Sequence, residues 1–133
     1  MTRASKSPAQ VALVVHPNLG MLSRFQESFA RGGLTTLLAR DLPTALLAIA
    51  ENEIAVAVIS WRVSEPGDGW ALGAALRRAF PKAFVVVLAA ETSVPTLQQA
   101  INRGFDQLYE ESCPAEKIAA DILSRPSRPH FVN

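Results

Sequence analysis

The amino-acid sequence predicts an α/β protein in which helices cover both faces of a parallel sheet. Apolar runs of strand length alternate five times with segments of helical periodicity, and the connections between them are short. Two of these runs, 56–59 and 84–88, are apolar at every position, as is typical of parallel strands buried on both faces. The 133 residues, 49% of them hydrophobic, are enough for one domain with a substantial core.

Five strands are expected, at 11–15, about 34–39, 56–59, 84–88 and 105–110. The last of them is mixed in polarity, which favours a place at the edge of the sheet. Right-handed crossovers leave few topologies, and the flavodoxin-like order 2-1-3-4-5 is the usual one at this size. We therefore expect one flavodoxin-like (βα)5 domain, a doubly wound parallel sheet, over residues 7–125. Residues 1–6 and 126–133 are expected to be flexible tails.

Apolar residues at helical spacing predict the buried face of each helix. They are Leu22, Phe25 and Phe29 in the first helix, Leu46, Ile49 and Ala50 in the second, Leu72, Leu76 and Phe80 in the third, Val94, Leu97 and Ile101 in the fourth, and Ile118 and Ile122 in the fifth. Arg77 and Arg78 are expected on the solvent side of the third helix. Residues that favour helix starts are predicted to cap the second to fifth helices: Asp41, Asp68, Ser93 and Ser112.

Charge and composition narrow the class of protein. The net charge is +1, so no strong field indicates a nucleic-acid partner. Cys113 is the only cysteine, which rules out an intramolecular disulfide and fits a reducing cytoplasm. No apolar run approaches the ~20 residues of a membrane helix, and the first residues are too polar for a signal peptide. We expect a soluble, cytoplasmic domain without nucleic-acid or membrane partners.

The strands and the residues that follow them resemble the receiver domain of bacterial two-component response regulators, over about residues 7–125. In that family the strand ends carry two acidic residues, a phosphorylated aspartate, a Thr or Ser, and a lysine. The matching positions of this sequence hold His16 and Pro17, Ser60, Ala89 and Glu111. The family's switch pair of Thr or Ser with an aromatic corresponds to Ala89 and Leu108. The resemblance therefore implies a degenerate receiver, or pseudo-receiver, with all five positions changed.

These replacements bear directly on the family's chemistry. Phosphotransfer to an aspartate needs a hard cation, and such a cation needs oxygen ligands. Pro17 offers no side-chain ligand, and the imidazole of His16 is a poor one for Mg²⁺. Ser60 cannot form an acyl phosphate, and Glu111 puts negative charge where the family has positive charge. We expect no metal, no cofactor and no enzymatic activity.

Other readings of the same residues stay open. His16 and Glu111 are predicted to pair across the crevice, with Ser60 hydrogen-bonded to one of them; alternatively, all three are solvated at its rim. The three residue types also match a nucleophilic triad, but the glycines of a nucleophile elbow are missing around Ser60. The stretch 65–69 resembles the family's Pro-x-x-Asp-Gly turn, and Trp61 is expected at the edge of the crevice.

The expected function is that of a receiver-like signalling module of a two-component or phosphorelay-type system. It would act by contact with a protein partner, a signalling protein or an output domain, without aspartyl phosphorylation. The resemblance implies an interaction face on the fourth helix, fifth strand and fifth helix, polar and suited to a transient contact or a weak homodimer. Its residues would be Gln98, Asn102, Gln107, Tyr109, Lys117 and Asp121. The alternative is a small-ligand-binding flavodoxin-like sensor domain that uses the crevice at the strand ends.

Overall fold

Five parallel strands form one sheet in the order β2-β1-β3-β4-β5, which confirms the predicted topology. This computed structural model describes residues 10–125; the expected tails at 1–6 and 126–133 lie outside that range. The strands are β1 (Val11–Val15), β2 (Thr35–Ala39), β3 (Val56–Ser60), β4 (Phe84–Ala89) and β5 (Gln107–Glu110). The fifth strand is shorter than expected, because the N–H of Phe105 donates to the Ala100 carbonyl before the ladder begins.

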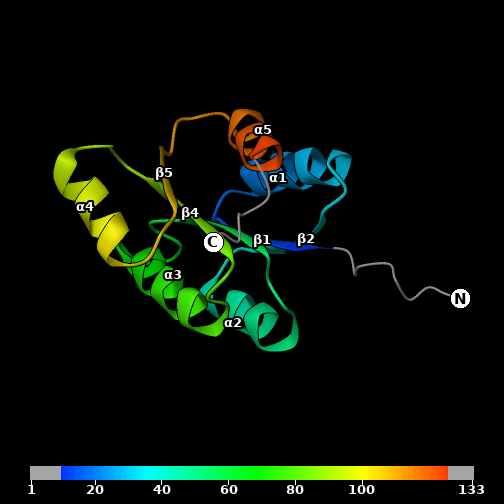
Figure 1. Cartoon of the computed structure of the whole chain (residues 1–133), viewed down its shortest axis with the longest axis horizontal. Coiled ribbons are helices and arrows are strands. Elements are labelled where there is room, and N and C mark those ends of the chain that lie inside the picture. The colour runs from blue at the N-terminus through cyan, green and yellow to red at the C-terminus, as the bar shows by residue number, and fades with distance from the viewer. Residues whose placement is uncertain (1–9, 126–133) are drawn as a thin grey trace, which may run out of the picture.

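The helices are α1 (Leu19–Arg31), α2 (Leu42–Glu51), α3 (Asp68–Ala79), α4 (Val94–Asn102) and α5 (Ala115–Ser124). Figure 1 shows α1 and α5 on one face of the sheet and α2 and α3 on the other. Each face has its own core. The residues of α1 and α5 pack on Ala12, Val14 and Val58, whereas those of α3 pack on neighbouring positions of the same strands. This alternation is the period of two that strands impose.

The predicted buried faces are correct for three helices, partly correct for α2 and wrong for α4. Leu22, Phe25, Phe29, Leu76, Ile118 and Ile122 are buried as expected. In α2, Leu46 is 52% exposed, whereas Ala45 is fully buried and the expected Ile49 packs against the same core. In α4, Val94, Leu97 and Ile101 are 76%, 48% and 64% exposed, and Ala100 is buried instead. In both helices an alanine is the most deeply buried residue, and several larger apolar side chains face outward.

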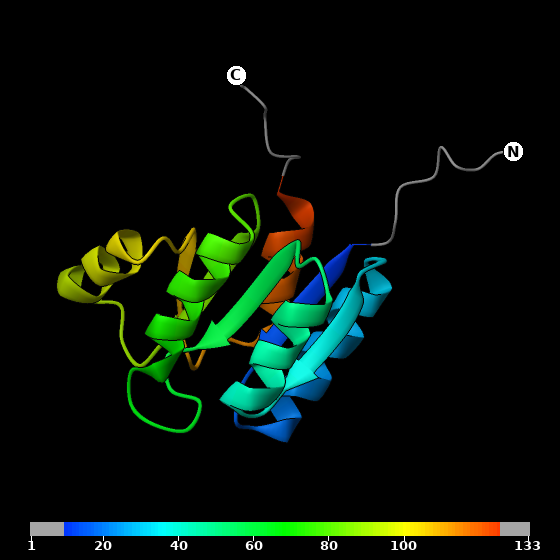
Figure 2. The same ribbon diagram turned by 90° about the horizontal axis from the view of Figure 1, so that it is seen from below.

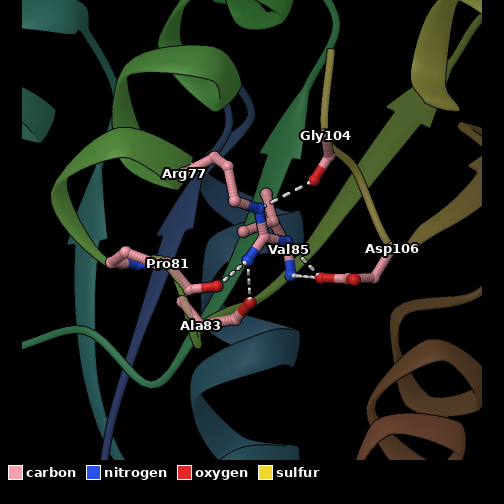
Figure 3. Close-up of polar contacts among 6 residues, drawn as sticks. All are labelled: Arg77, Pro81, Ala83, Val85, Gly104 and Asp106. Carbon is pink, nitrogen blue, oxygen red and sulfur yellow. Dashed lines mark hydrogen bonds and ion pairs between the residues drawn. The ribbon is translucent and has the colours of Figure 1, made fainter. Parts of the chain in front are cut away.

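Arg77 is the second departure from expectation, because it points into the structure rather than to solvent. Its guanidinium donates to the carbonyls of Gly104 (3.0 Å), Pro81 (2.7 Å) and Ala83 (2.8 Å), and it forms an ion pair with Asp106. Asp106 also accepts from the N–H of Val85 at 2.8 Å. Figure 3 shows these contacts converging on one side chain. Arg77 thus ties α3 to the N-terminal ends of β4 and β5.

Two of the four predicted caps are present. The side chains of Asp41 and Ser93 accept hydrogen bonds from the N–H groups of Thr44 and Thr96. Ser112 does not cap α5, because its hydroxyl donates to Glu110 and the helix starts after Pro114. Asp68 does not cap α3 either, and its different role is described with the site.

Candidate functional site

The carboxyl ends of the strands bring the predicted site residues to one edge of the sheet. β1 pairs with β3 and β3 with β4, in a register that aligns Val15 with Ile59 and Ser60 with Leu88. Figure 2 shows the strands from the side of α2 and α3, with their arrowheads at a common edge. Because β2 lies on the other side of β1, the direction of winding changes there, where parallel sheets bind ligands.

His16 follows β1 and is half-buried at this edge. The Nδ1 atom of its imidazole accepts a hydrogen bond from the backbone N–H of Asn18 at 3.0 Å. The backbone N–H of His16 donates to the Ala39 carbonyl. Burial lowers the pKa of the His16 imidazole, and the negative charge of Glu111 opposes that shift. Within residues 10–125, no ion pair joins His16 to Glu111. The expected close pair is therefore absent, and Glu111 acts on His16 only through its field.

Ser60, at the end of β3, is only 3% exposed. Its hydroxyl donates to the Arg62 carbonyl at 2.8 Å and accepts from the Arg62 N–H at 3.3 Å. The expected hydrogen bond to His16 or Glu111 is therefore not formed, and the alternative of a solvated rim is also wrong for this residue. A serine held by backbone groups two residues away has no base beside it, so the triad geometry is missing.

The start of α3 lies directly against the end of β3. The N–H of Gly69 donates to the Trp61 carbonyl at 3.0 Å, and a Cβ built on Gly69 would come within 1.8 Å of the Ser60 carbonyl oxygen. No side chain fits there, so glycine is required for this close approach. This contact packs the start of α3 against the backbone of Ser60 and Trp61.

Asp68 organises the loop between β3 and α3 rather than the helix that it begins. Its carboxylate accepts from the N–H groups of Val63 (2.7 Å), Ser64 (2.9 Å) and Glu65 (2.9 Å). Gly67, with a φ of 87°, is the residue before the helix, and it turns the chain so that the carboxylate points back to the loop. Burial raises the pKa of Asp68, but the loop N–H groups outweigh it and hold that pKa below its ordinary value.

The two positions predicted to match the receiver switch, Ala89 and Leu108, carry apolar side chains. Ala89 is 1% exposed and accepts a backbone hydrogen bond from the N–H of Glu111 at 2.7 Å. Leu108 packs with the α3 core, whereas Tyr109 packs on the opposite face of β5. Glu111 itself is exposed. The structure therefore offers no hydroxyl at the end of β4 and no aromatic behind it.

A hollow of about 210 Å³ lies beside the end of β4, and sequence reasoning missed most of its lining. Its walls are Trp61, Trp70, Ala89, Ala90, Glu91, Thr96 and Gln99. Trp70 is held edge-on against Phe105, with ring centroids 5.5 Å apart. The expected position of Trp61 at the crevice is confirmed. The other lining residues come from α3, from the end of β4 and the loop after it, and from α4, and no local pattern in the sequence marks them as neighbours.

The predicted interaction face brings only part of its residues together. The Tyr109 hydroxyl donates to the Asp121 carboxylate at 2.9 Å, and the Lys117 ammonium donates to the same carboxylate at 3.3 Å. Burial, with the neighbouring Asp121 carboxylate, raises the pKa of Tyr109 to about 12. Gln98 and Asn102 are exposed on α4, and Gln107 is exposed on β5. This face is less polar than expected, because Val94, Leu97 and Ile101 of α4 are exposed beside it.

Among the described residues, no group of three or more His, Cys, Asp or Glu side chains is placed to hold a metal ion. In residues 10–125, none of the helices has the length and apolarity needed to cross a bilayer.

Solved structures of response regulators superpose on this chain. One is a response regulator from Burkholderia pseudomallei with a phosphorylated aspartic acid, a calcium ion and citrate; it is 21% identical, with a TM-score of 0.73 over 85% of this chain and 70% of its own. A CheY-like receiver domain from Methanospirillum hungatei is 14% identical, with a TM-score of 0.76 over 86% and 91%. The chain has the fold of a response-regulator receiver domain.

The chemotaxis response regulator CheY4 of Vibrio cholerae shares this receiver fold, at 15% identity and a TM-score of 0.76 over 86% of this chain and 97% of its own. No protein-family model and no curated protein matches the sequence. At identities this low, the receiver-like structures establish the architecture. What the site does has to be argued from its own residues.

Proposed function

We propose that this domain is a receiver-like signalling module that acts through contact with a protein partner, without Mg²⁺-dependent phosphorylation of an aspartate. The observation that carries the proposal is Ser60. It occupies the end of β3, where receivers carry their acceptor aspartate, and it is 3% exposed with its hydroxyl bonded to backbone groups of Arg62. A buried hydroxyl held in this way presents no nucleophile to a phosphoryl donor.

The surroundings of Ser60 support the same proposal. The end of β1 supplies an imidazole and a proline, and the nearest carboxylate after β5 belongs to Glu111. A hard divalent cation needs several oxygen ligands at one point, and these residues do not provide them. Asp68, the aspartate closest along the chain to Ser60, accepts hydrogen bonds from three loop N–H groups. Among the described residues around Ser60, no pocket is formed that would neutralise the charge of a phosphoryl group.

A receiver fold without this chemistry still offers surfaces for binding. α4 exposes three apolar side chains beside β5, and a groove of about 250 Å³ runs between these two elements. Exposed apolar side chains of this kind are typical of protein contact sites. Phosphorylation would not be needed to expose them, because they are already exposed in the structure.

The test uses Trp61, whose ring lies at the edge of the carboxyl-end crevice. Titration with Mg²⁺ and beryllofluoride, a phosphoryl mimic, should leave the fluorescence of the protein unchanged, and incubation with acetyl phosphate should add no phosphoryl group detectable by mass spectrometry. A variant with His16→Asp, Pro17→Asp and Ser60→Asp restores the carboxylates and serves as the positive control. Stable acyl-phosphate labelling of the unchanged chain would refute the proposal.

A second candidate function is supported by the hollow beside β4. Two tryptophans, Trp61 and Trp70, line it with the polar residues Glu91, Thr96 and Gln99, a composition suited to a small planar ligand. Its volume of about 210 Å³ limits that ligand to a molecule of a few rings at most. A small-molecule screen by thermal shift and tryptophan quenching separates the two functions. Saturable binding of a small molecule that is lost in the Gln99→Trp variant would favour the small-ligand-binding sensor function.

A further inference from the structure

Helix α2 differs from α1 and α5 in the chemistry of its exposed face, and it shares with α4 an exposed apolar stripe without charged side chains. The solvent sides of α1 and α5 carry charged side chains such as Arg24, Glu27 and Lys117. By contrast, the outer face of α2 is built from four exposed residues without charge: Pro43, Leu46, Leu47 and Ala50. We call these four residues the α2 stripe. Leu46 is 52% exposed and Leu47 is 57% exposed, which is unusual for leucines in a helix that already covers a sheet.

The spacing of the α2 stripe is that of a helix-packing surface. Its members stand at positions i, i+3, i+4 and i+7, so they lie within about one 100° sector of the helix. The opposite sector, with Ala45 fully buried, meets the sheet. In Figure 2 no other helix or strand of the described chain lies over α2 on the viewer's side. The helix therefore has two apolar faces, one of them without a partner within residues 10–125.

Exposed charges near the two ends of α2 suit a second copy of the same helix: Arg40 beside the ionised cap Asp41 at one end, and Glu51 with Glu53 at the other. Exposed Arg40 lies just before the helix, and exposed Glu51 and Glu53 lie at its end and just beyond it. Within the described chain none of these three takes part in an ion pair. The nearby Asp41 is engaged with the N–H of Thr44 as the helix cap. A helix of ten residues is about 15 Å long, so the two charged ends are well separated.

We propose that two copies of this chain associate through α2, with the helices antiparallel about a two-fold axis. In that arrangement the α2 stripe of one copy packs on the same stripe of the other, as an isologous contact requires. Arg40 of each copy comes beside Glu51 and Glu53 of its partner at both ends. A parallel pairing would instead bring like charges together, so the charges select the antiparallel one. The small side chain of Ala50 permits the 8–10 Å helix separation of such pairs.

The contact is expected to be weak. Four side chains on one short helix bury far less than the ~800 Å² per partner of a standard interface, so we expect a dissociation constant of roughly 0.1–1 mM. A contact this weak becomes populated when a larger assembly gathers several copies and raises their local concentration. It lies on α2 and does not involve the α4–β5–α5 face, so it is independent of the function proposed above.

Sedimentation velocity and NMR over about 10 µM to 1 mM test the proposal, because this range brackets the expected dissociation constant. The average mass of the wild-type chain should rise with concentration, and the amide shifts of residues 40–53 should move with it. Leu47→Glu should abolish both effects, whereas Ile101→Glu, a matched change at an equally exposed position on α4, should leave them. Circular dichroism checks that both variants are folded.

A charge exchange tests the antiparallel geometry. Arg40→Glu alone and Glu51→Arg/Glu53→Arg alone should each associate at least about fivefold more weakly than wild type, because each places like charges at both ends of the pair. An equimolar mixture of the two should recover wild-type affinity. A monomer at every concentration, unmoved shifts at 40–53, or association lost only in Ile101→Glu would overturn the α2 contact. A mixture no tighter than its parts would overturn the antiparallel pairing.

Discussion

His16 lies where burial and the charge of a neighbour act on one side chain in opposite directions. Burial favours the neutral imidazole and lowers its pKa, and the Glu111 carboxylate favours the charged form. The Asn18 N–H donates to Nδ1, which requires a lone pair on that nitrogen and so also favours the neutral ring. The neutral form of the His16 imidazole is therefore favoured at neutral pH.

A proton titration of His16 by NMR should give a midpoint below the ordinary value of 6.5. Glu111→Gln should lower it further, because within residues 10–125 Glu111 is the charge that raises the His16 pKa. Between the folded pKa and 6.5 the unfolded chain binds more protons than the folded one, so the His16 contribution to stability is present above 6.5 and is lost as the pH falls through this window.

The exposed neighbour Glu110 supplies the matched control for the His16 titration. Glu110→Gln removes a carboxylate from the same segment but should leave the His16 midpoint where it is, since Glu110 is not among the charges that act on it. A midpoint at or above 6.5, or an equal response to both changes, would contradict the burial and the Glu111 field described here.

At the scale of elements, α2 and α4 show how a helix can be fixed to a sheet by its small side chains. Ala45 and Ala100 are buried against the strands, and several larger apolar residues of both helices face outward. Close approach of backbone to sheet makes this orientation favourable for the helix, and it leaves leucines, a valine and an isoleucine for other contacts. Helix α3 behaves in the usual way, with Leu72 and Leu76 inward.

Two leucine truncations should separate these modes of packing. Leu76→Ala, at 0% exposure, should lower the free energy of unfolding by about 2–5 kcal/mol, because it leaves a cavity in the core. Leu97→Ala, at 48% exposure, should lower it by less than about 1 kcal/mol. Urea denaturation measures both. Equal losses at the two positions would mean that α4 packs on the sheet through its apolar stripe after all.

Across the whole molecule, the two edges of the sheet have different tasks. The carboxyl edge holds the altered receiver positions, and the opposite edge holds Arg77, which joins α3 to the starts of β4 and β5 (Figure 3). The Arg77 and Asp106 side chains are 24% and 25% exposed, so their pairing is better shielded from water than a surface ion pair. The contacts that stabilise the fold and the residues of the candidate site thus lie at opposite ends of the strands.

Arg77→Met should lower the free energy of unfolding by about 2–3 kcal/mol, because three carbonyls and one carboxylate lose a charged donor. Arg78→Met, at the exposed neighbouring position, should change it by no more than about 0.5 kcal/mol. Guanidinium melts followed by circular dichroism give both values. The fluorescence of Trp61 in the folded state should be the same in both variants; a change only in Arg77→Met would show that the two edges are coupled.

The sequence by itself determined the class, the number of elements and their order. Alternating apolar runs and helical spacing suffice for this, because strand and helix periods are local properties of a chain. The same local reasoning located His16, Ser60, Ala89 and Glu111 at one edge, since the carboxyl ends of parallel strands meet there.

Only the tertiary structure decided which way the side chains face. Spacing showed an apolar stripe on α2 and α4 but could not show that Ala45 and Ala100 become buried while Leu46 and the α4 stripe stay exposed. It showed Arg77 and Asp68 as polar residues but not that they collect backbone groups from loops up to 27 positions away. These outcomes depend on how closely two backbones approach, and that distance is set by the packing of the whole fold.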